Sequence, residues 1–301
     1  MSLRRYVASG NGRPFAIVGV LAVAVAGGTI LGVIEGLVDR WISLLLLFPA
    51  LIGAAAGVPA AWMVRRQQLR APAVVLVLGI VGGAAGYLAL HVVDYVRFRT
   101  EFTEAIRTQN PSETAAGAAA AVDQALVDRT GKSGVLGFLA IAARQGVTIK
   151  RVGVGDPGLA LTGAGAWGVW LFELALAAGA AGLLARRQAR QPFCESCQAW
   201  YGPPSLVASG GAVSRGARKQ FIGALDRGDV DAASTAFRGP RGRQFNFSLT
   251  SSSCPRCTAD LYCALRRVSA RNPAHAPPLE SWLMTKEELA HLGQAIARPR
   301  A

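Results

Sequence analysis

The sequence predicts a mainly α-helical membrane protein with four transmembrane helices, a small α-rich extracytoplasmic insert and a C-terminal α+β domain. Of its 301 residues, 51% are hydrophobic and 17% are charged, whereas soluble domains carry about 25% charged residues. Four apolar runs are each long enough for a helix to cross the ~30 Å hydrocarbon core of a bilayer. All 5 cysteines follow residue 190, which sets the last part of the chain apart from the apolar part.

The apolar runs differ in how they begin and end. They cover residues 14–38, 41–64, 71–93 and 159–185. The first begins like a signal peptide, but it continues beyond the usual apolar core of ~7–15 residues. We therefore expect it to be retained as a membrane helix, with cleavage as the alternative. Asp39 and Arg40 are the only link to the second run, so this run must return antiparallel to the first.

Basic residues mark one side of the membrane. They cluster at Arg4, Arg5 and Arg13, at Arg65, Arg66 and Arg70, and at Arg186, Arg187 and Arg190. With four alternating crossings these clusters all fall on one face, and Lys and Arg accumulate on the cytoplasmic side. We therefore expect a multi-pass protein of the bacterial inner membrane with both termini in the cytoplasm. The predicted parts are 1–93 (N-terminal tail and three helices), 94–158 (extracytoplasmic insert), 159–190 (fourth helix and basic stop) and 191–301 (cytosolic domain).

The insert has no excess of positive charge, since it holds 8 basic and 7 acidic residues. Asn110, followed by a proline, is typical of a helix N-cap, so an Ala-rich helix is predicted from there to about Arg129. A second helix is predicted from Ser133 to about Gly146. The segment 147–152 alternates between apolar and polar residues like a short strand.

Small residues recur at four-residue spacing in the apolar runs. The pairs are Gly28, Gly32 and Gly36, then Gly53 and Gly57, Gly79 and Gly83, and Gly82 and Gly86. Close backbone approach at such stripes holds membrane helices together. The pattern predicts packing within the chain, with a homo-oligomer through these stripes as the alternative.

Glu173 lies near the middle of the fourth apolar run, where a charged side chain is costly. Trp167 and Trp170 precede it on roughly the same helix face, and an indole N–H could donate to its carboxyl group. Glu173 is thus a candidate for an interhelical hydrogen bond, which is a structural role. Its functional alternative is a proton or cation relay, or a contact to a transported substrate.

Two Cys-x-x-Cys pairs are the strongest chemical signal. They are Cys194 with Cys197 and Cys254 with Cys257. Two such knuckles supply the four tetrahedral sulfur ligands of a structural Zn²⁺, and cytosolic thiols stay reduced. A redox dithiol, bound iron and a metal-free state are the alternatives. Cys263 is left over and is interpreted as a small buried hydrophobic residue.

The second knuckle lies between two predicted strands, 244–249 and 261–268. The knuckles and this hairpin resemble a zinc ribbon, and the chain as a whole resembles bacterial polytopic membrane proteins that end in such a ribbon. The spacing between the knuckles is longer than in compact ribbons, so a predicted helical hairpin, 218–225 and 230–237, is an insertion between the two halves. Thr285 begins a capping box that opens a last helix.

No set of residues indicates catalysis, so we expect neither an enzyme nor a cofactor other than zinc. The leading expectation is an interaction or scaffold role, with membrane lipid and an unknown protein as partners. A small transporter or channel component using Glu173 is one alternative. Membrane-tethered nucleic-acid binding is a third and less favoured one, because lipid headgroups are nearer to the basic tail. The basic residues concerned are Arg238, Arg241, Arg243, Arg256, Arg266 and Arg267.

Overall fold

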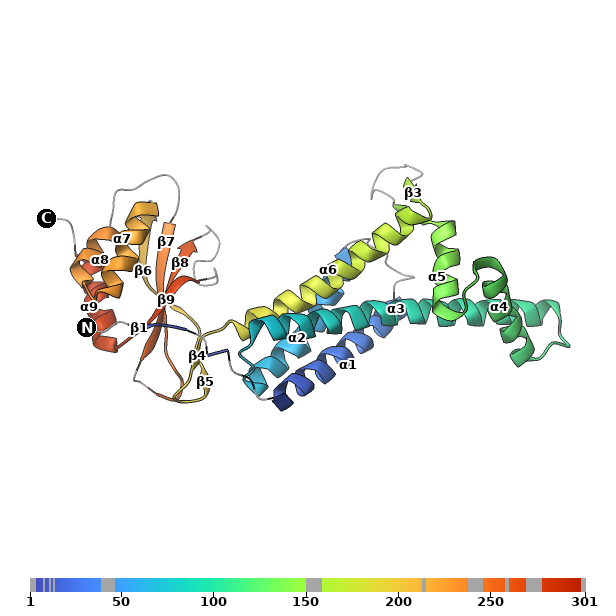
Figure 1. The fold of residues 1–301 in the computed structure, drawn as a ribbon, viewed down its shortest axis with the longest axis horizontal. Helices are drawn as coiled ribbons and strands as arrows, with labels where there is room; N and C mark the ends of the chain where they lie inside the picture. Colours follow the sequence, from blue (N-terminus) through green and yellow to red (C-terminus); the bar gives the residue numbers. More distant parts are fainter. Residues whose placement is uncertain are drawn as a thin grey trace. The chain divides into compact units, whose positions relative to one another are not determined.

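The computed structural model divides the chain into two compact units (Figure 1). Residues 10–190 form the helical bundle, and residues 1–9 join residues 191–301 in the C-terminal domain. The structure describes residues 4–7, 9, 10, 12, 14–38, 47–149, 159–212, 215–237, 246–257, 260–268 and 278–298. Each unit is described by itself below.

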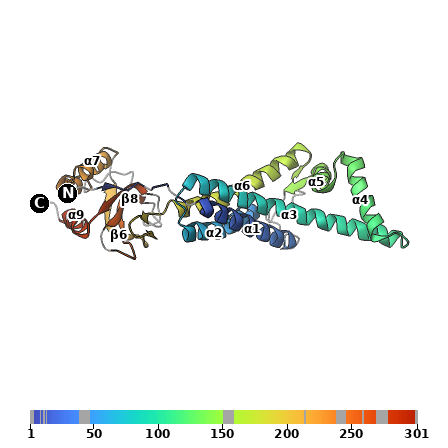
Figure 2. The same ribbon diagram turned by 60° about the horizontal axis from the view of Figure 1, so that its bottom comes forward.

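Four long helices build the bundle. They are α1 (Pro14–Val38), α2 (Leu47–Gln67), α3 (Pro72–Gln109) and α6 (Ala164–Ala189). Among the described residues, α1, α3 and α6 are long and apolar enough to cross a membrane. Helix α2 packs against α6 and α1 in the same bundle (Figure 2). The predicted link at residues 39 and 40 and the start of the second run lie outside the described residues.

Glycine contacts fix the directions of the helices. A Cβ at Gly28 or Gly32 of α1 would overlap the carbonyl oxygen of Gly82 or Gly86 of α3, respectively, so these two helices run parallel. A Cβ at Gly27 of α1 would lie 2.8 Å from the Pro59 ring of α2. Because Gly19, two turns earlier, instead faces the later residue Met63, α1 and α2 run antiparallel.

Helix α3 uses a second glycine face against α6. A Cβ at Gly79 would lie 2.7 Å from Cα of Gly182, and one at Gly83 would lie 2.7 Å from the carbonyl oxygen of Ala177. These numbers run in opposite directions, so α3 and α6 are antiparallel. The predicted stripes therefore pack within the chain, because close approach of helix backbones requires residues without a Cβ.

Both basic helix ends lie at the same end of the bundle. Arg65 and Arg66 are in the last turn of α2, and Arg186 and Arg187 are in the last turn of α6. These helices run parallel, since Gly53 and Gly57 face Ala177 and Ala181 in turn. One buried cluster at this end joins the start of α1 to both basic ends through Ala16, Val20, Val64, Leu69, Ala185 and Ala189.

Large apolar side chains point away from the bundle, and small ones fill it. Phe15 is 89% exposed, and several other large side chains are more than half exposed. They include Val18, Ile30, Leu51, Val58, Trp62, Leu88, Leu171, Phe172 and Leu183. Soluble monomers rarely expose contiguous apolar patches of this extent. The outer surface of the bundle thus suits lipid, in keeping with three described helices that are long and apolar enough to cross a membrane.

The insert departs from the prediction at its start. Helix α3 continues as one helix through Asp94 to Gln109, about 57 Å in all at 1.5 Å per residue. Asn110 ends this helix instead of capping the next one, because its backbone N–H still donates to Ile106. The next helix, α4 (Ala115–Thr130), is capped by Thr114, whose hydroxyl accepts from the Gly117 N–H.

The rest of the insert follows the prediction more closely. Helix α5 (Gly134–Gln145) is preceded by Ser133, as expected, although this side chain makes no capping hydrogen bond. Strand β2 (Val147–Ile149) pairs antiparallel with β3 (Leu159–Leu161). The first residues of the fourth apolar run therefore form a strand, and α6 begins at Ala164.

The C-terminal domain is a five-stranded antiparallel sheet of order β1-β9-β8-β7-β6. The strands are β1 (Arg4–Arg5), β6 (Ser205–Ala212), β7 (Asn246–Ser252), β8 (Leu261–Val268) and β9 (Pro278–Met284). Helices α7 (Arg215–Asp226), α8 (Val230–Phe237) and α9 (Lys286–Ala297) share one core with this sheet. Trp282 of β9 is fully buried there, beside Phe221 of α7.

Several predicted elements of this domain are confirmed. The helical hairpin is α7 and α8, turned at Gly228, whose φ of +72° suits a residue without a Cβ. The return strand is β8, and α9 begins with the predicted capping box, in which Thr285 and Glu288 each accept from the other's backbone N–H. Strands β1, β6 and β9 were not predicted.

Candidate functional site

The first knuckle is a small hairpin at the start of the C-terminal domain. Strand β4 (Phe193–Cys194) pairs with β5 (Ala199–Trp200), so that Cys194 lies opposite Ala199. Gln198 completes the turn with a positive φ of 50°, and its side-chain amide donates to the carbonyl of Glu195 at 2.7 Å. Residues between the strands thus turn back tightly, which brings Cys197 round towards Cys194.

The second knuckle is the turn between β7 and β8. The backbone N–H of Arg256 donates to the Cys254 sulfur at 3.4 Å, and Cys257 follows on the same turn. The Gly202 N–H donates to the carbonyl of Ser253 at 2.9 Å, which ties the chain after the first knuckle to the second. The two knuckles therefore face each other although 56 residues (198–253) separate them in the sequence.

The four cysteine sulfurs form one cluster. They lie within 4.8 Å of one another, and the Cys194 and Cys257 sulfurs are 3.8 Å apart. A tetrahedral ion with metal–sulfur bonds of ~2.3 Å requires sulfurs about 3.8 Å apart. Cys194 and Cys254 are buried, and Cys197 and Cys257 are half-buried. The donor set and its spacing thus fit a metal ion with a closed four-sulfur shell.

Surrounding groups shift the pKa values of Cys197 and Cys254 in opposite directions. The hydrogen bond to Cys257, helped by burial, raises the pKa of Cys197 to about 12. Burial acts to raise the pKa of Cys254 as well, but backbone N–H groups of Arg256 and Cys257 donate to its sulfur and bring its pKa below the ordinary value. The second knuckle is therefore shaped to hold a thiolate, the form that binds metal.

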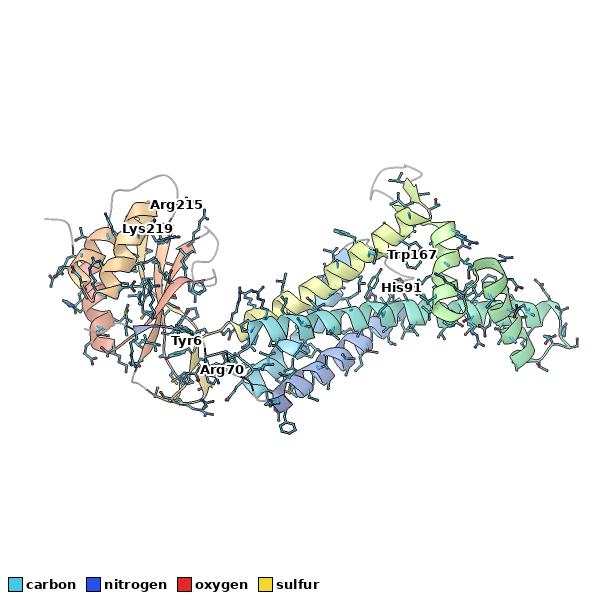
Figure 3. The ribbon with its side chains drawn as sticks, in the orientation of Figure 1. Tyr6, Arg70, His91, Trp167, Arg215 and Lys219 are labelled. Carbon is cyan, nitrogen blue, oxygen red and sulfur yellow. The ribbon has the colours of Figure 1, made fainter. Side chains whose placement is uncertain are left out.

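Aromatic rings surround the cluster. Tyr201 and Tyr262 are buried with Cys194 and Cys254 in one group, and the two rings lie 5.8 Å apart. Tyr6, from the N-terminal tail, packs edge-on against Tyr262 at 5.1 Å. Figure 3 labels Tyr6 beside the strands of this domain. No local pattern around Arg4 and Arg5 predicts this contact, because their positive charge indicates only the side of the membrane.

The N-terminal strand is held to the domain by more than its sheet pairing. Arg5 forms a bidentate ion pair with Asp226, at 2.6 and 3.1 Å. The indole N–H of Trp282 donates to the same carboxylate at 3.3 Å. The hydrogen bond from Arg5 is the largest cause of the lowered pKa of Asp226. Residues from both ends of the chain thus meet at one buried tryptophan.

Glu173 is bonded across the bundle by Tyr87 of α3. The Tyr87 hydroxyl donates to the Glu173 carboxylate at 2.9 Å, and Tyr87 is only 4% exposed. The phenol of Tyr87 was not recognised as a donor in the sequence, although it lies within the third apolar run. Glu35 of α1 is also buried, at 7% exposed, on the face whose Gly32 contacts Gly86 of α3.

The tryptophans predicted near Glu173 belong to an aromatic group with His91. Trp167 and Trp170 meet edge-on with ring centroids 5.2 Å apart. Trp170 lies 5.8 Å from His91, which in turn lies 4.7 Å from Tyr87. Figure 3 labels His91 and Trp167 near the same part of the bundle. The tryptophans thus flank the Tyr87–Glu173 pair through His91.

The predicted basic face of the tail is only partly described. Arg238, Arg241 and Arg243 lie outside the described residues. Arg266 is 8% exposed and its Nε donates to the Thr250 hydroxyl at 3.0 Å, so its guanidinium links strands β8 and β7. Arg256 and Arg267 are exposed.

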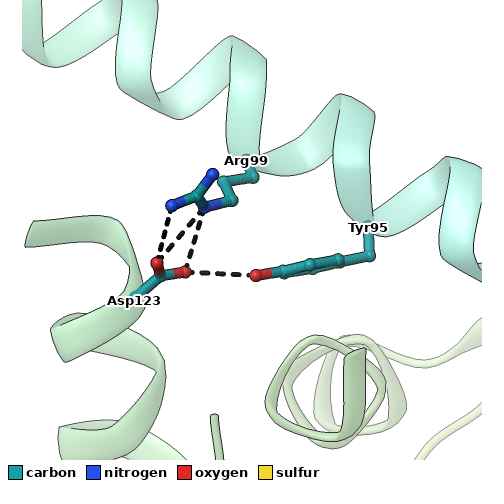
Figure 4. A network of polar contacts seen from close by, with 3 residues as sticks. All are labelled: Tyr95, Arg99 and Asp123. Carbon is teal, nitrogen blue, oxygen red and sulfur yellow. Dashed lines mark hydrogen bonds and ion pairs between the residues drawn. The ribbon is translucent and has the colours of Figure 1, made fainter. Parts of the chain in front are cut away.

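A polar network joins α3 to α4 in the insert (Figure 4). Arg99 makes a bidentate ion pair with Asp123, with a shortest distance of 2.8 Å, and the Tyr95 hydroxyl donates to the same carboxylate at 3.1 Å. The hydrogen bond from Arg99 is the largest cause of the lowered pKa of Asp123. This network fixes α4 on α3.

The chain matches no family model, no curated protein and no solved structure.

Proposed function

We propose that the protein crosses the bacterial inner membrane four times, with both termini in the cytoplasm, and presents a zinc-stabilised interaction module there. The observation that carries the proposal is the pairing of β1 with β9, which puts residues 4–6 in the same domain as residues 278–284. Both segments then lie in the same aqueous compartment, so the chain between them must cross the membrane an even number of times.

The count of crossings follows from the helices. Three helices, α1, α3 and α6, are long and apolar enough to span, and three crossings would separate the two segments. Helix α2 therefore supplies the fourth crossing, in keeping with its antiparallel packing on α1. The basic ends of α2 and α6 lie on one side, and the positive-inside rule assigns that side to the cytoplasm.

The metal of the module is proposed to be zinc. Cytosolic thiols stay reduced, four thiolates favour zinc over harder ions, and a closed shell leaves no position for water or substrate. A zinc-ribbon-like module is supported by the position of one knuckle in a short hairpin and of the other in the β7–β8 turn, with α7 and α8 between them in the chain. A closed site stabilises a fold, so the module is suited to docking a protein partner beside the membrane lipid.

Two measurements test the architecture. Ser112→Cys, in the exposed link between α3 and α4, should react with a membrane-impermeant maleimide on intact cells, whereas the wild-type cysteines should react only after the membrane is opened. Purified protein should hold about one zinc per chain, lost in Cys257→Ser and kept in Cys263→Ala. Labelling of the wild-type protein on intact cells would invert the topology and remove the zinc assignment.

The interaction role is tested in the native membrane. Cross-linking should recover one defined partner in fixed ratio with the wild-type protein and with Cys263→Ala, and lose it with Cys257→Ser. The matched cysteine control separates loss of the module from loss of any thiol. Recovery of the same partner with both variants would show that the metal module does not present the docking surface.

A transporter or channel component is the second candidate, favoured by the Tyr87–Glu173 hydrogen bond inside the bundle. Intramembrane carboxylates mark ion or proton paths by default. In proteoliposomes, Glu173→Gln should abolish proton- or cation-coupled flux if this function holds and should leave partner binding intact. Absence of flux in the wild-type protein would exclude it.

A further inference from the structure

Tyr6, which directly follows β1, packs against the group that contains the four cysteines. Its backbone N–H donates to the carbonyl of Ser281 on β9 at 3.0 Å, which extends the pairing of β1. Its ring lies edge-on to Tyr262 at 5.1 Å, and Tyr262 packs with Cys194 and Cys254. Tyr6 is thus held in the aromatic wall of the cluster.

Tyr6 also touches the residue that precedes the first ligand. The backbone N–H of Phe193 donates to the Tyr6 hydroxyl at 3.0 Å, and Phe193 is 1% exposed. Because Cys194 follows Phe193 on the same short strand, the Tyr6 hydroxyl fixes the backbone from which the first sulfur projects. Groups that orient a metal ligand from outside the coordination shell typically change metal affinity by about 10–100-fold when removed.

The same hydrogen bond joins the two segments that connect the domain to the bundle. Tyr6 precedes α1 in the chain, and Phe193 follows α6. Strand β1 itself is 2 residues long, so its sheet pairing alone is a weak attachment. The ion pair of Arg5 with Asp226 and the packing of Tyr6 against the cluster add to the attachment of this segment to the domain.

We infer that metal binding at the four cysteines and docking of the N-terminal strand are coupled, with Tyr6 as the positioning residue that links them. The inference rests on the metal centre of the proposed function and adds a metal-dependent clasp between the segments leading to α1 and from α6. Coupling of two binding equilibria is reciprocal. The metal therefore strengthens the docking of the strand, and the strand strengthens the binding of the metal by the same factor.

The test uses the full chain in detergent micelles and Zn²⁺ as the probe. Zinc affinity is measured by competition with a chromophoric chelator, and amide exchange of residues 4–7 is measured by mass spectrometry with and without chelation. Tyr6→Ala should weaken zinc binding by about 10–100-fold. Tyr6→Phe keeps the ring against Tyr262 but lacks the acceptor oxygen, and should weaken it by about tenfold, the lower end of that range.

Val7→Ala is the matched control, because the neighbouring Val7 side chain is 80% exposed, and it should leave zinc affinity unchanged. Chelation should accelerate exchange of the Tyr6 amide in the wild-type protein by at least about tenfold, as expected for the reciprocal effect. Unchanged affinity in Tyr6→Ala, with one zinc still bound and exchange insensitive to chelation, would overturn the clasp and leave the metal centre standing. A wild-type protein that binds no zinc would overturn both.

Discussion

Adjacent glycines of α3 offer a sharp test of how the bundle is held together. Gly82 faces α1, where a Cβ would lie 2.7 Å from the carbonyl oxygen of Ala24. Gly83 faces α6, where a Cβ would lie 2.7 Å from the carbonyl oxygen of Ala177 and 2.8 Å from Cα of Ala178. Each neighbour is backbone, which cannot rotate away. Substitution by alanine therefore forces one helix pair apart at either position.

The expected cost follows from these distances. An ordinary carbon–oxygen contact is about 3.4 Å, so each pair must separate by roughly 0.7 Å, and a gap of 0.5–1 Å forfeits about a quarter to a half of each dispersion contact. Overpacking of this kind costs about 1–3 kcal/mol. Alanine recovers about 0.5–1 kcal/mol through its higher helix propensity. Gly82→Ala and Gly83→Ala should therefore each destabilise the protein by up to about 2.5 kcal/mol, and each should be about 1–3 kcal/mol less stable than an alanine substitution without overpacking.

Gly179→Ala on α6 is the matched control, because a Cβ there meets nothing within 4 Å. It should be neutral or stabilising by up to about 1 kcal/mol. Unfolding of the purified protein in mixed micelles, followed by circular dichroism as denaturing detergent is added, measures all three variants against wild type. If Gly82→Ala and Gly83→Ala were as stable as Gly179→Ala, close backbone contact would not be what holds the bundle, and the packing would have to be different.

Three further substitutions test the polar contacts of both units. Tyr87→Phe removes the donor to Glu173 and should destabilise the bundle by about 0.6–2 kcal/mol in the same detergent titration, whereas no loss would show that the carboxyl group is satisfied without it. Thr285→Ala removes the capping box of α9 and should cost about 1 kcal/mol by thermal unfolding; an unchanged melting temperature would contradict the cap. Asp123→Asn removes the ion pair with Arg99, whose guanidinium holds the Asp123 pKa below its usual range. The contribution of that pair is present above the unfolded pKa of about 3.9 and is lost as the pH falls through the lower folded value. Both partners are more than a third exposed, so wild type should exceed Asp123→Asn by at most about 1 kcal/mol near neutral pH. The two should converge in acid, and a difference that grew in acid would contradict the assignment.

Local patterns predicted the elements whose signals are contained in a few neighbouring residues. The capping box at Thr285, the helical hairpin of α7 and α8 and the return strand 261–268 are all present where expected. The N-cap predicted at Asn110 is wrong. The Asn110 backbone N–H donates to the carbonyl of Ile106 at the end of α3, and Thr114 caps the next helix. A capping motif indicates where a helix can start, but the residues before it determine whether the preceding helix has already ended.

Strands β6, β9 and β1 carry weaker local signals. Ser205–Ala212 is rich in small residues and lacks apolar alternation, and β1 is 2 residues long. Strand β6 pairs with β7, β9 pairs with β8, and β1 pairs with β9, and in each case the partner supplies the hydrogen bonds that stabilise the strand. The partners of β6 and β1 lie far away in the sequence, outside any local window.

The sequence by itself determined which helices are apolar, which small residues recur on them, and that two Cys-x-x-Cys knuckles are available, because composition and spacing are local properties. The tertiary structure alone decided that Gly82 and Gly83 serve different neighbours, that Tyr87 satisfies Glu173, and that the N-terminal strand returns to the C-terminal domain. Each of these joins residues far apart in the chain. Such contacts form only when the whole chain has folded, and the sequence around either partner alone does not specify them.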